Sequence, residues 1–184
     1  MGSPAVFLDR DGVIAESRQA RGGPGPPRSV ADTTIPDGTE DALRALRGSG
    51  FRLVVITNQP DVARGSATEA GVTAINDSLR DALALDAFYV CFHDGSECAC
   101  RKPRPGLLLD ATRDLDLDLA RSWLIGDRWV DIAAGNAAGV QTVLIEREWS
   151  WAATSSGVPP DDLLPHATVT TIRDAAEHIL RSSR

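Results

Sequence analysis

Residues 7–14 read FLDRDGVI, and this stretch sets the fold. Its first two residues end an apolar run at residues 5–8. This run is continuous rather than alternating, which is typical of a strand buried on both faces of a parallel sheet. Asp9 and Asp11 follow at its carboxyl end, and side chains two residues apart leave an extended chain on the same side. Two neighbouring carboxylates repel unless a cation or a proton intervenes, and Mg²⁺ prefers such oxygen ligands. A plain turn is the alternative interpretation, since Asp-Gly pairs are common in turns.

The alternation of apolar strands and helices continues from here to the C-terminus. Further apolar runs predict strands at residues 52–57, 87–90, 122–125 and 141–145. Capping signals and closing glycines predict five helices: one opened by a capping box at 37–40 and running to about 47, one capped at 66–69 and running to about 83, and others at about 105–115, 130–138 and 172–181. The stretch 18–36 is predicted to be irregular. This pattern predicts an α/β protein whose central parallel sheet has helices on both faces.

Polar side chains lie at the carboxyl ends of three predicted strands, namely Asp9 with Asp11, Thr57 with Asn58, and Asp127. The carboxyl ends of parallel strands meet at one edge of the sheet, where ligands bind. Phosphoryl transfer needs charge neutralisation and an in-line nucleophile. A carboxylate such as Asp9 can be that nucleophile, giving an acyl-phosphate that water then hydrolyses. Asp11 could protonate the leaving oxygen and later activate the water, while Thr57 could hydrogen-bond a phosphoryl oxygen.

Lys102 is the only lysine among the 19 basic residues, and all the others are arginines. Such a bias indicates that arginine replaces lysine wherever either will serve. A lysine that survives it is a candidate for work that needs a compact ammonium instead of a planar guanidinium, such as neutralising a phosphoryl oxygen. Chance is the alternative explanation.

The composition fits one globular domain that spans residues 1–184. Hydrophobic residues make up 42% of the 184 residues and charged residues 24%, and the net charge is -7. The chain has no basic patch of the kind that binds nucleic acid, whereas a small anionic substrate needs only local positive charge and a metal. No apolar run is long enough to cross a bilayer, and we find no signal peptide. We therefore expect a cytoplasmic protein with no membrane or nucleic-acid partner.

All three cysteines and one of the three histidines fall within ten residues. Cys91, His93, Cys98 and Cys100 form the pattern C-x-H-x4-C-x-C. Three thiolates and one imidazole match a tetrahedral structural zinc site, and a closed four-ligand site has no open position for catalysis. We expect a zinc-binding loop at residues 91–100 that folds the segment delivering Arg101 and Lys102.

Four motifs occur in order along residues 5–145: FLDRDGVI at 7–14, VITNQ at 55–59, RKP at 101–103 and IGDRWVD at 125–131. Together they resemble the motifs of the haloacid dehalogenase (HAD) superfamily of phosphatases. The resemblance implies a Rossmann-like HAD fold, and no insertion is long enough for a large cap domain.

The resemblance also implies a role for each motif residue. Asp9 is then the nucleophile and a Mg²⁺ ligand, and Asp11 is the general acid and base and binds the metal through its backbone carbonyl. Thr57 and Lys102 hold the phosphoryl group, and Asp127 is the third metal ligand. Asp131 orients its neighbours, unless it is only an acid favoured at a helix start. The expected substrate contacts are Asn58, Gln59, Arg101 and Arg128.

The cysteine cluster narrows the resemblance to the branch that contains heptose bisphosphate phosphatases and histidinol-phosphate phosphatases. The run RKPRPGLL at 101–108 is more similar to the heptose group. Two departures leave the substrate open: residues 15–20 read AESRQA, where that group has a substrate-contacting element, and the loop between His93 and Cys98 is short, as in the histidinol group. We expect a monomer acting on a small phosphorylated sugar, with histidinol phosphate as the alternative substrate.

Two other classes of function remain as competing hypotheses. One is a zinc-stabilised interaction module, which would have no need for the five residues Asp9, Asp11, Thr57, Lys102 and Asp127. The other is a nucleic-acid 3′-phosphatase, which the acidic composition disfavours.

Overall fold

A computed structural model describes residues 2–20, 23–95 and 98–183. Its strands are β1 (Ala5–Leu8), β2 (Arg18–Ala20), β3 (Gly23–Gly25), β4 (Arg52–Asn58), β5 (Ala87–Cys91), β6 (Trp123–Gly126), β7 (Gln141–Ile145) and β8 (Ala167–Val169). Its α-helices are α1 (Thr39–Gly48), α2 (Glu69–Leu83), α3 (Gly106–Leu115), α4 (Trp129–Ala138) and α5 (Ile172–Ser182). Short 3₁₀ turns lie at Val30–Asp32 and Leu119–Arg121.

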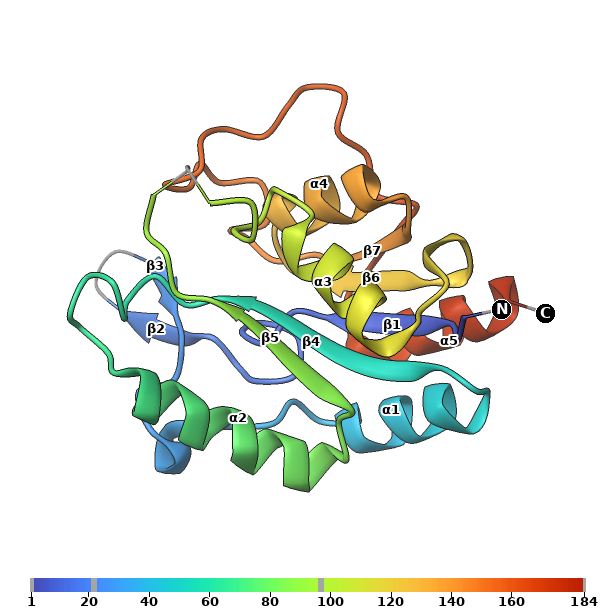
Figure 1. The fold of residues 1–184 in the computed structure, drawn as a ribbon, viewed down its shortest axis with the longest axis horizontal. Helices are drawn as coiled ribbons and strands as arrows, with labels where there is room; N and C mark the ends of the chain where they lie inside the picture. The colour runs from blue at the N-terminus through green and yellow to red at the C-terminus, as the bar shows by residue number, and fades with distance from the viewer. Residues whose placement is uncertain (1, 21–22, 96–97, 184) are drawn as a thin grey trace.

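The central sheet is parallel and has the strand order β5-β4-β1-β6-β7-β8. In its register Leu8 lies level with Val55 of β4 and Ile125 of β6. From this row, β1 ends at Leu8 itself, β6 ends one residue later at Gly126 and β4 ends three residues later at Asn58, so the three central strands end close together at one edge of the sheet. The segments that follow these strands gather at the left end of the molecule in Figure 1, together with the β2–β3 hairpin. This is the edge where the sequence predicts the site.

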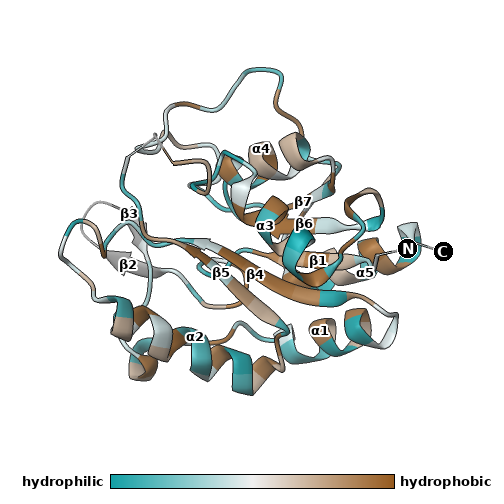
Figure 2. Ribbon diagram, viewed as in Figure 1, coloured by the Kyte–Doolittle hydropathy of each residue, from teal (hydrophilic) through white to brown (hydrophobic). Residues whose placement is uncertain are grey.

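Helices cover both faces of the sheet, and β1 shows why (Figures 1 and 2). Its four residues are fully buried and point alternately to the two faces. Val6 and Leu8 belong to the core between the sheet and helices α1, α2 and α5, whereas Ala5 and Phe7 belong to the core between the sheet and helices α3 and α4. The continuous apolar run of β1 thus follows from burial on both sides, as predicted.

Most predicted elements lie where the sequence places them, and the exceptions are one helix start and three short strands. Within the predicted cap at 66–69, Thr68 is the residue that caps α2. The capping box at residues 37–40 is wrong, because α1 begins after Gly38, which has φ of 81° and makes no side-chain cap bond. The C-terminal helix does begin with a capping box, formed by Thr171 and Asp174. The stretch 18–36, predicted to be irregular, contains the β2–β3 hairpin, and β8 was not predicted. Among the described residues, none of the helices is long and apolar enough to cross a membrane.

Candidate active site

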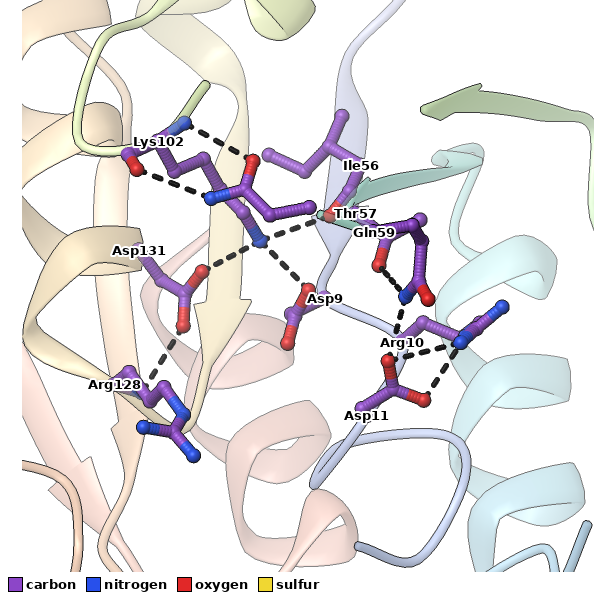
Figure 3. Close-up of polar contacts among 10 residues, drawn as sticks. Asp9, Arg10, Asp11, Ile56, Thr57, Gln59, Lys102, Arg128 and Asp131 are labelled. Carbon is purple, nitrogen blue, oxygen red and sulfur yellow. Dashed lines mark hydrogen bonds and ion pairs between the residues drawn. The ribbon is translucent and has the colours of Figure 1, made fainter. Parts of the chain in front are cut away.

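The site is centred on Lys102, whose side chain is 2% exposed. Its Nζ lies 2.6 Å from Asp9 Oδ1 and 2.6 Å from Asp131 Oδ1, and it donates to the backbone oxygen of Ile56 at 3.0 Å (Figure 3). The backbone of Lys102 is held as well, since Asn58 makes one hydrogen bond to its N–H and another to its carbonyl, both of 3.1 Å. The lysine is therefore fixed at both ends beside Asp9.

Burial and charge oppose each other at this centre. The pKa of Asp9 is raised to about 7: burial raises it most, the ammonium of Lys102 lowers it, and the carboxylates of Asp131 and Asp11 add to the rise. Burial also opposes the charge of Lys102, but Asp131 and Asp9 outweigh it and raise the pKa of the ammonium. One cation therefore does not fully compensate this set of acids, and a second would favour their ionised forms.

Asp127 adds a third buried carboxylate at the end of β6. One oxygen each from Asp9, Asp127 and Asp131 lie within 4.8 Å of one another. Asp127 Oδ1 is buried and has no hydrogen-bond partner in the described part of the chain. Burial and the neighbouring Asp9 raise the pKa of Asp127 well above its usual range. An unpartnered, buried carboxylate oxygen beside two other acids is a fit for a hard cation such as Mg²⁺.

Asp11 has its carboxylate turned away from this cluster (Figure 3). Arg10 Nε and Nη2 donate to its two oxygens at 2.9 and 3.0 Å, and Gln59 Nε2 donates to Oδ2 at 2.7 Å. Gln59 also donates to the hydroxyl of Thr57 at 2.9 Å, so it links two of the predicted catalytic residues. The acid cluster therefore consists of the carboxylates of Asp9, Asp127 and Asp131, and the carboxylate of Asp11 is not part of it.

Arg10 is a residue that sequence reasoning missed. It is 0% exposed, and besides its two bonds to Asp11 it donates to Asn76 of α2 at 2.9 Å. A buried guanidinium needs such partners, because an unpaired one would be costly. Its position between two acids in FLDRDGVI was the signal that could have revealed it.

The four predicted zinc ligands come together next to this centre. Cys91 Sγ lies 3.6 Å from His93 Nδ1, 3.7 Å from Cys98 Sγ and 3.2 Å from Cys100 Sγ, and all four ligand atoms lie within 4.8 Å of one another. A zinc–sulfur bond of about 2.3 Å gives tetrahedral edges of about 3.8 Å, so the set fits a zinc ion. Residues 96 and 97 of the predicted loop lie outside the described residues.

A cleft of about 1190 Å³ opens over the site around Asp9 and Lys102. Its walls include Asp9, Asp11, Thr57, Asn58, Gln59, Arg101, Lys102, Arg128 and Asp131. Arg101 donates to the carbonyl of His93 at 2.9 Å and to Ser155 Oγ at 2.8 Å, so it joins the cysteine loop to the segment after β7. Trp149, which was not among the predicted site residues, also lines the cleft and donates from its indole nitrogen to Asp127 Oδ2 at 2.6 Å.

Comparisons with known proteins agree with this geometry. Residues 99–175 match the family described as "HAD-hyrolase-like". The chain is 40% identical over 157 residues to the D-glycero-beta-D-manno-heptose-1,7-bisphosphate 7-phosphatase of Escherichia coli K12, covering 78% of this chain and 79% of that protein. It is 33% identical to the enzyme of the same name from Vibrio cholerae, over 98% of both chains.

A solved structure shows the same fold. The D,D-heptose 1,7-bisphosphate phosphatase of B. bronchiseptica, complexed with magnesium and phosphate, superposes with a TM-score of 0.78 at 29% identity and covers 97% of this chain and 99% of that one. The chain therefore belongs to the haloacid dehalogenase superfamily of phosphatases, in the family of the D-glycero-beta-D-manno-heptose-1,7-bisphosphate 7-phosphatases.

Proposed function

We propose that this protein is a Mg²⁺-dependent phosphatase that removes the C7 phosphate of a heptose 1,7-bisphosphate. The observation that carries the chemistry is the 2.6 Å contact of Lys102 Nζ with Asp9 Oδ1, beside the unpartnered Oδ1 of Asp127. The substrate follows from the family, whose enzymes from E. coli and V. cholerae carry this activity in their names.

In the proposed reaction Asp9 attacks the phosphorus atom. An Asp9 oxygen–phosphorus bond forms, the bond from phosphorus to the C7 oxygen breaks, and Asp11 supplies the proton that this oxygen takes up. Asp11 then removes a proton from the water that releases phosphate and regenerates the Asp9 carboxylate. The cleft places both carboxylates on its walls, and Gln59 connects Asp11 to Thr57. Lys102 and Thr57 would hold phosphoryl oxygens as their charge develops.

The metals have separate roles in this proposal. Mg²⁺ would be held by Asp9, Asp127 and the backbone carbonyl of Asp11, and when bound it supplies charge neutralisation at the phosphoryl group. Zinc at Cys91, His93, Cys98 and Cys100 would be structural. Its loop is tied to the site, because Arg101 bonds the His93 carbonyl and the adjacent Lys102 carries the ammonium.

Arg101 and Arg128 are the proposed contacts for the second phosphate. Both line the cleft, and a guanidinium fork suits a phosphate. Arg101 uses two of its terminal N–H groups on His93 and Ser155, and a guanidinium has five N–H donors in all. Arg64 is less suitable, since it is engaged by Asp94 through two hydrogen bonds.

Steady-state kinetics on the bisphosphate and on histidinol phosphate test the proposal. Histidinol phosphate has no second phosphate and carries cationic groups, so it gains nothing from these arginines. We expect kcat/KM for the bisphosphate to exceed that for histidinol phosphate at least about a hundredfold, the value of one or two charge-assisted contacts. Phosphorus NMR of the product should show phosphate retained at C1. Equal or faster turnover of histidinol phosphate would replace the proposed substrate with the alternative.

A further inference from the structure

The two carboxylate oxygens of Asp127 have different surroundings. Oδ2 accepts the indole N–H of Trp149 at 2.6 Å, whereas Oδ1 is buried and unpartnered among the described residues. Gly12 closes the remaining space on the Oδ2 side, because a β-carbon built on it would lie 2.2 Å from Oδ2. The carboxylate is thus held by one oxygen and presents the other to the acid cluster.

Trp149 is itself held on the segment that follows β7, seen as the orange loop in Figure 1. The neighbouring Ser150 donates from its hydroxyl to the Asp127 carbonyl at 2.6 Å, and its own carbonyl accepts from the backbone N–H of Trp129 at 2.9 Å. Trp129 donates from its indole to the Ala152 carbonyl at 3.0 Å. The residue next to Trp149 is therefore hydrogen-bonded to the backbone just after β6, and this holds the Trp149 indole beside the Asp127 carboxylate.

We propose that Trp149 is a positioning residue that orients Asp127 so that its Oδ1 faces a bound divalent cation. This inference rests on the proposed function, which places Mg²⁺ at Asp127. A charge-assisted N–H bond to one oxygen fixes the rotation of a carboxylate and favours its ionised form. Groups that hold a metal ligand in this way set the affinity of the site without touching the metal. Nothing in the sequence around Trp149 indicated this role.

Calorimetric titration with Mg²⁺ tests the role directly. Trp149→Phe keeps an aromatic ring but removes the donor, and Trp151→Phe is the matched control, since Trp151 is 38% exposed and lies outside the lining of the cleft. We expect Trp149→Phe to raise the Kd for Mg²⁺ at least about tenfold, and Trp151→Phe to leave it within twofold. Asp127→Asn should abolish binding. A Trp149→Phe Kd within twofold of the wild-type value would overturn the proposal.

A second measurement uses the wild-type protein and holds even if Trp149→Phe fails to fold. The chain has four tryptophans, so its ¹⁵N–¹H spectrum contains four indole N–H signals. Phe variants of Trp123, Trp129 and Trp151 assign three of them and leave the fourth to Trp149. The Trp149 signal should shift on titration with Mg²⁺ with the calorimetric Kd, and the Trp151 signal should not. Mg²⁺ binding with a stationary Trp149 signal would refute the positioning role. Failure of the wild type to bind Mg²⁺ would instead refute the proposed metal site itself.

Discussion

Lys102 shows how much composition alone can indicate about the role of a single residue. Its isolation among 19 basic residues singled it out, and the structure places its Nζ against Asp9, Asp131 and the Ile56 carbonyl. The three contacts surround a compact ammonium on a side chain that is 2% exposed, and a planar guanidinium would place its donors differently. The bias against lysine and the packing of this site therefore point to the same conclusion.

Lys102→Arg should consequently be poorly active although it keeps the charge. We expect kcat to fall at least about a hundredfold, the usual cost of losing one pre-organised donor. The matched control is Arg113→Lys, the reverse exchange at an exposed position on α3, which should leave kcat unchanged. Near-normal turnover by Lys102→Arg would mean that the sole lysine is a compositional accident.

Gly12 is a second residue whose identity follows from the site. It has φ of 93°, which favours glycine, and its Cα lies against the Asp127 carboxylate. Gly50 has a similar φ of 91°, but a β-carbon there would meet nothing within 4 Å. Comparing the two positions separates the cost of the backbone conformation from the cost of the close approach.

Gly12→Ala should therefore lower the free energy of unfolding by at least about 1 kcal/mol more than Gly50→Ala does, because only the first displaces a buried carboxylate. Urea unfolding curves of the two variants measure this difference. Equal losses would show that the contact with Asp127 contributes nothing to stability.

At the scale of elements, the strands and long helices could be predicted because burial on both faces leaves a continuous apolar run and helices carry their own stop signals. The order of the four motifs likewise placed Asp9, Thr57, Lys102 and Asp127 at one edge. Contacts between distant segments could not be predicted in this way. Trp149 lies 22 residues from Asp127, and the pairing of Arg10 with Asn76 spans 66 residues, so no local pattern records either contact.

The conformation of the loop between β5 and α3 should depend on zinc, because this loop and the last residue of β5 carry the four proposed zinc ligands. Its hydrogen bonds also hold the segment that presents Lys102. Beyond Arg101, Arg104 donates to the Cys98 carbonyl at 3.1 Å and Gly106 donates to the Ala99 carbonyl at 3.1 Å. Burial and the neighbouring Cys100 thiol raise the pKa of the Cys91 thiol to about 12, so a bound metal would be needed to keep it as a thiolate.

Purified protein should accordingly contain about one zinc per chain. Stripping the zinc should lower the melting temperature and reduce activity even in excess Mg²⁺, and adding zinc back should restore both. Elemental analysis and thermal melting provide the measurements. An absence of zinc, or an unchanged melting temperature after stripping, would count against the structural role.

For the whole molecule, the proposal is a single domain that acts without a partner subunit. Of the large hydrophobic side chains exposed among the described residues, Trp151, Val158 and Leu164 lie on the segment between β7 and β8, and Val30 and Leu109 lie elsewhere. A stable dimer normally buries a larger apolar surface. Sedimentation equilibrium should give a mass near 19.6 kDa, and a mass near twice this value would contradict the prediction of a monomer.

The central claim, that Asp9 carries the phosphoryl group, can be tested on the intermediate itself. Acid quenching during turnover, followed by reduction with borohydride, converts an aspartyl-phosphate to homoserine, and mass spectrometry of the digested protein locates it. We expect homoserine at position 9 in the wild type, and none in Asp9→Asn, which should bind substrate without turning it over. Turnover by the wild type with no modified residue, or with the modification at another carboxylate, would contradict the account.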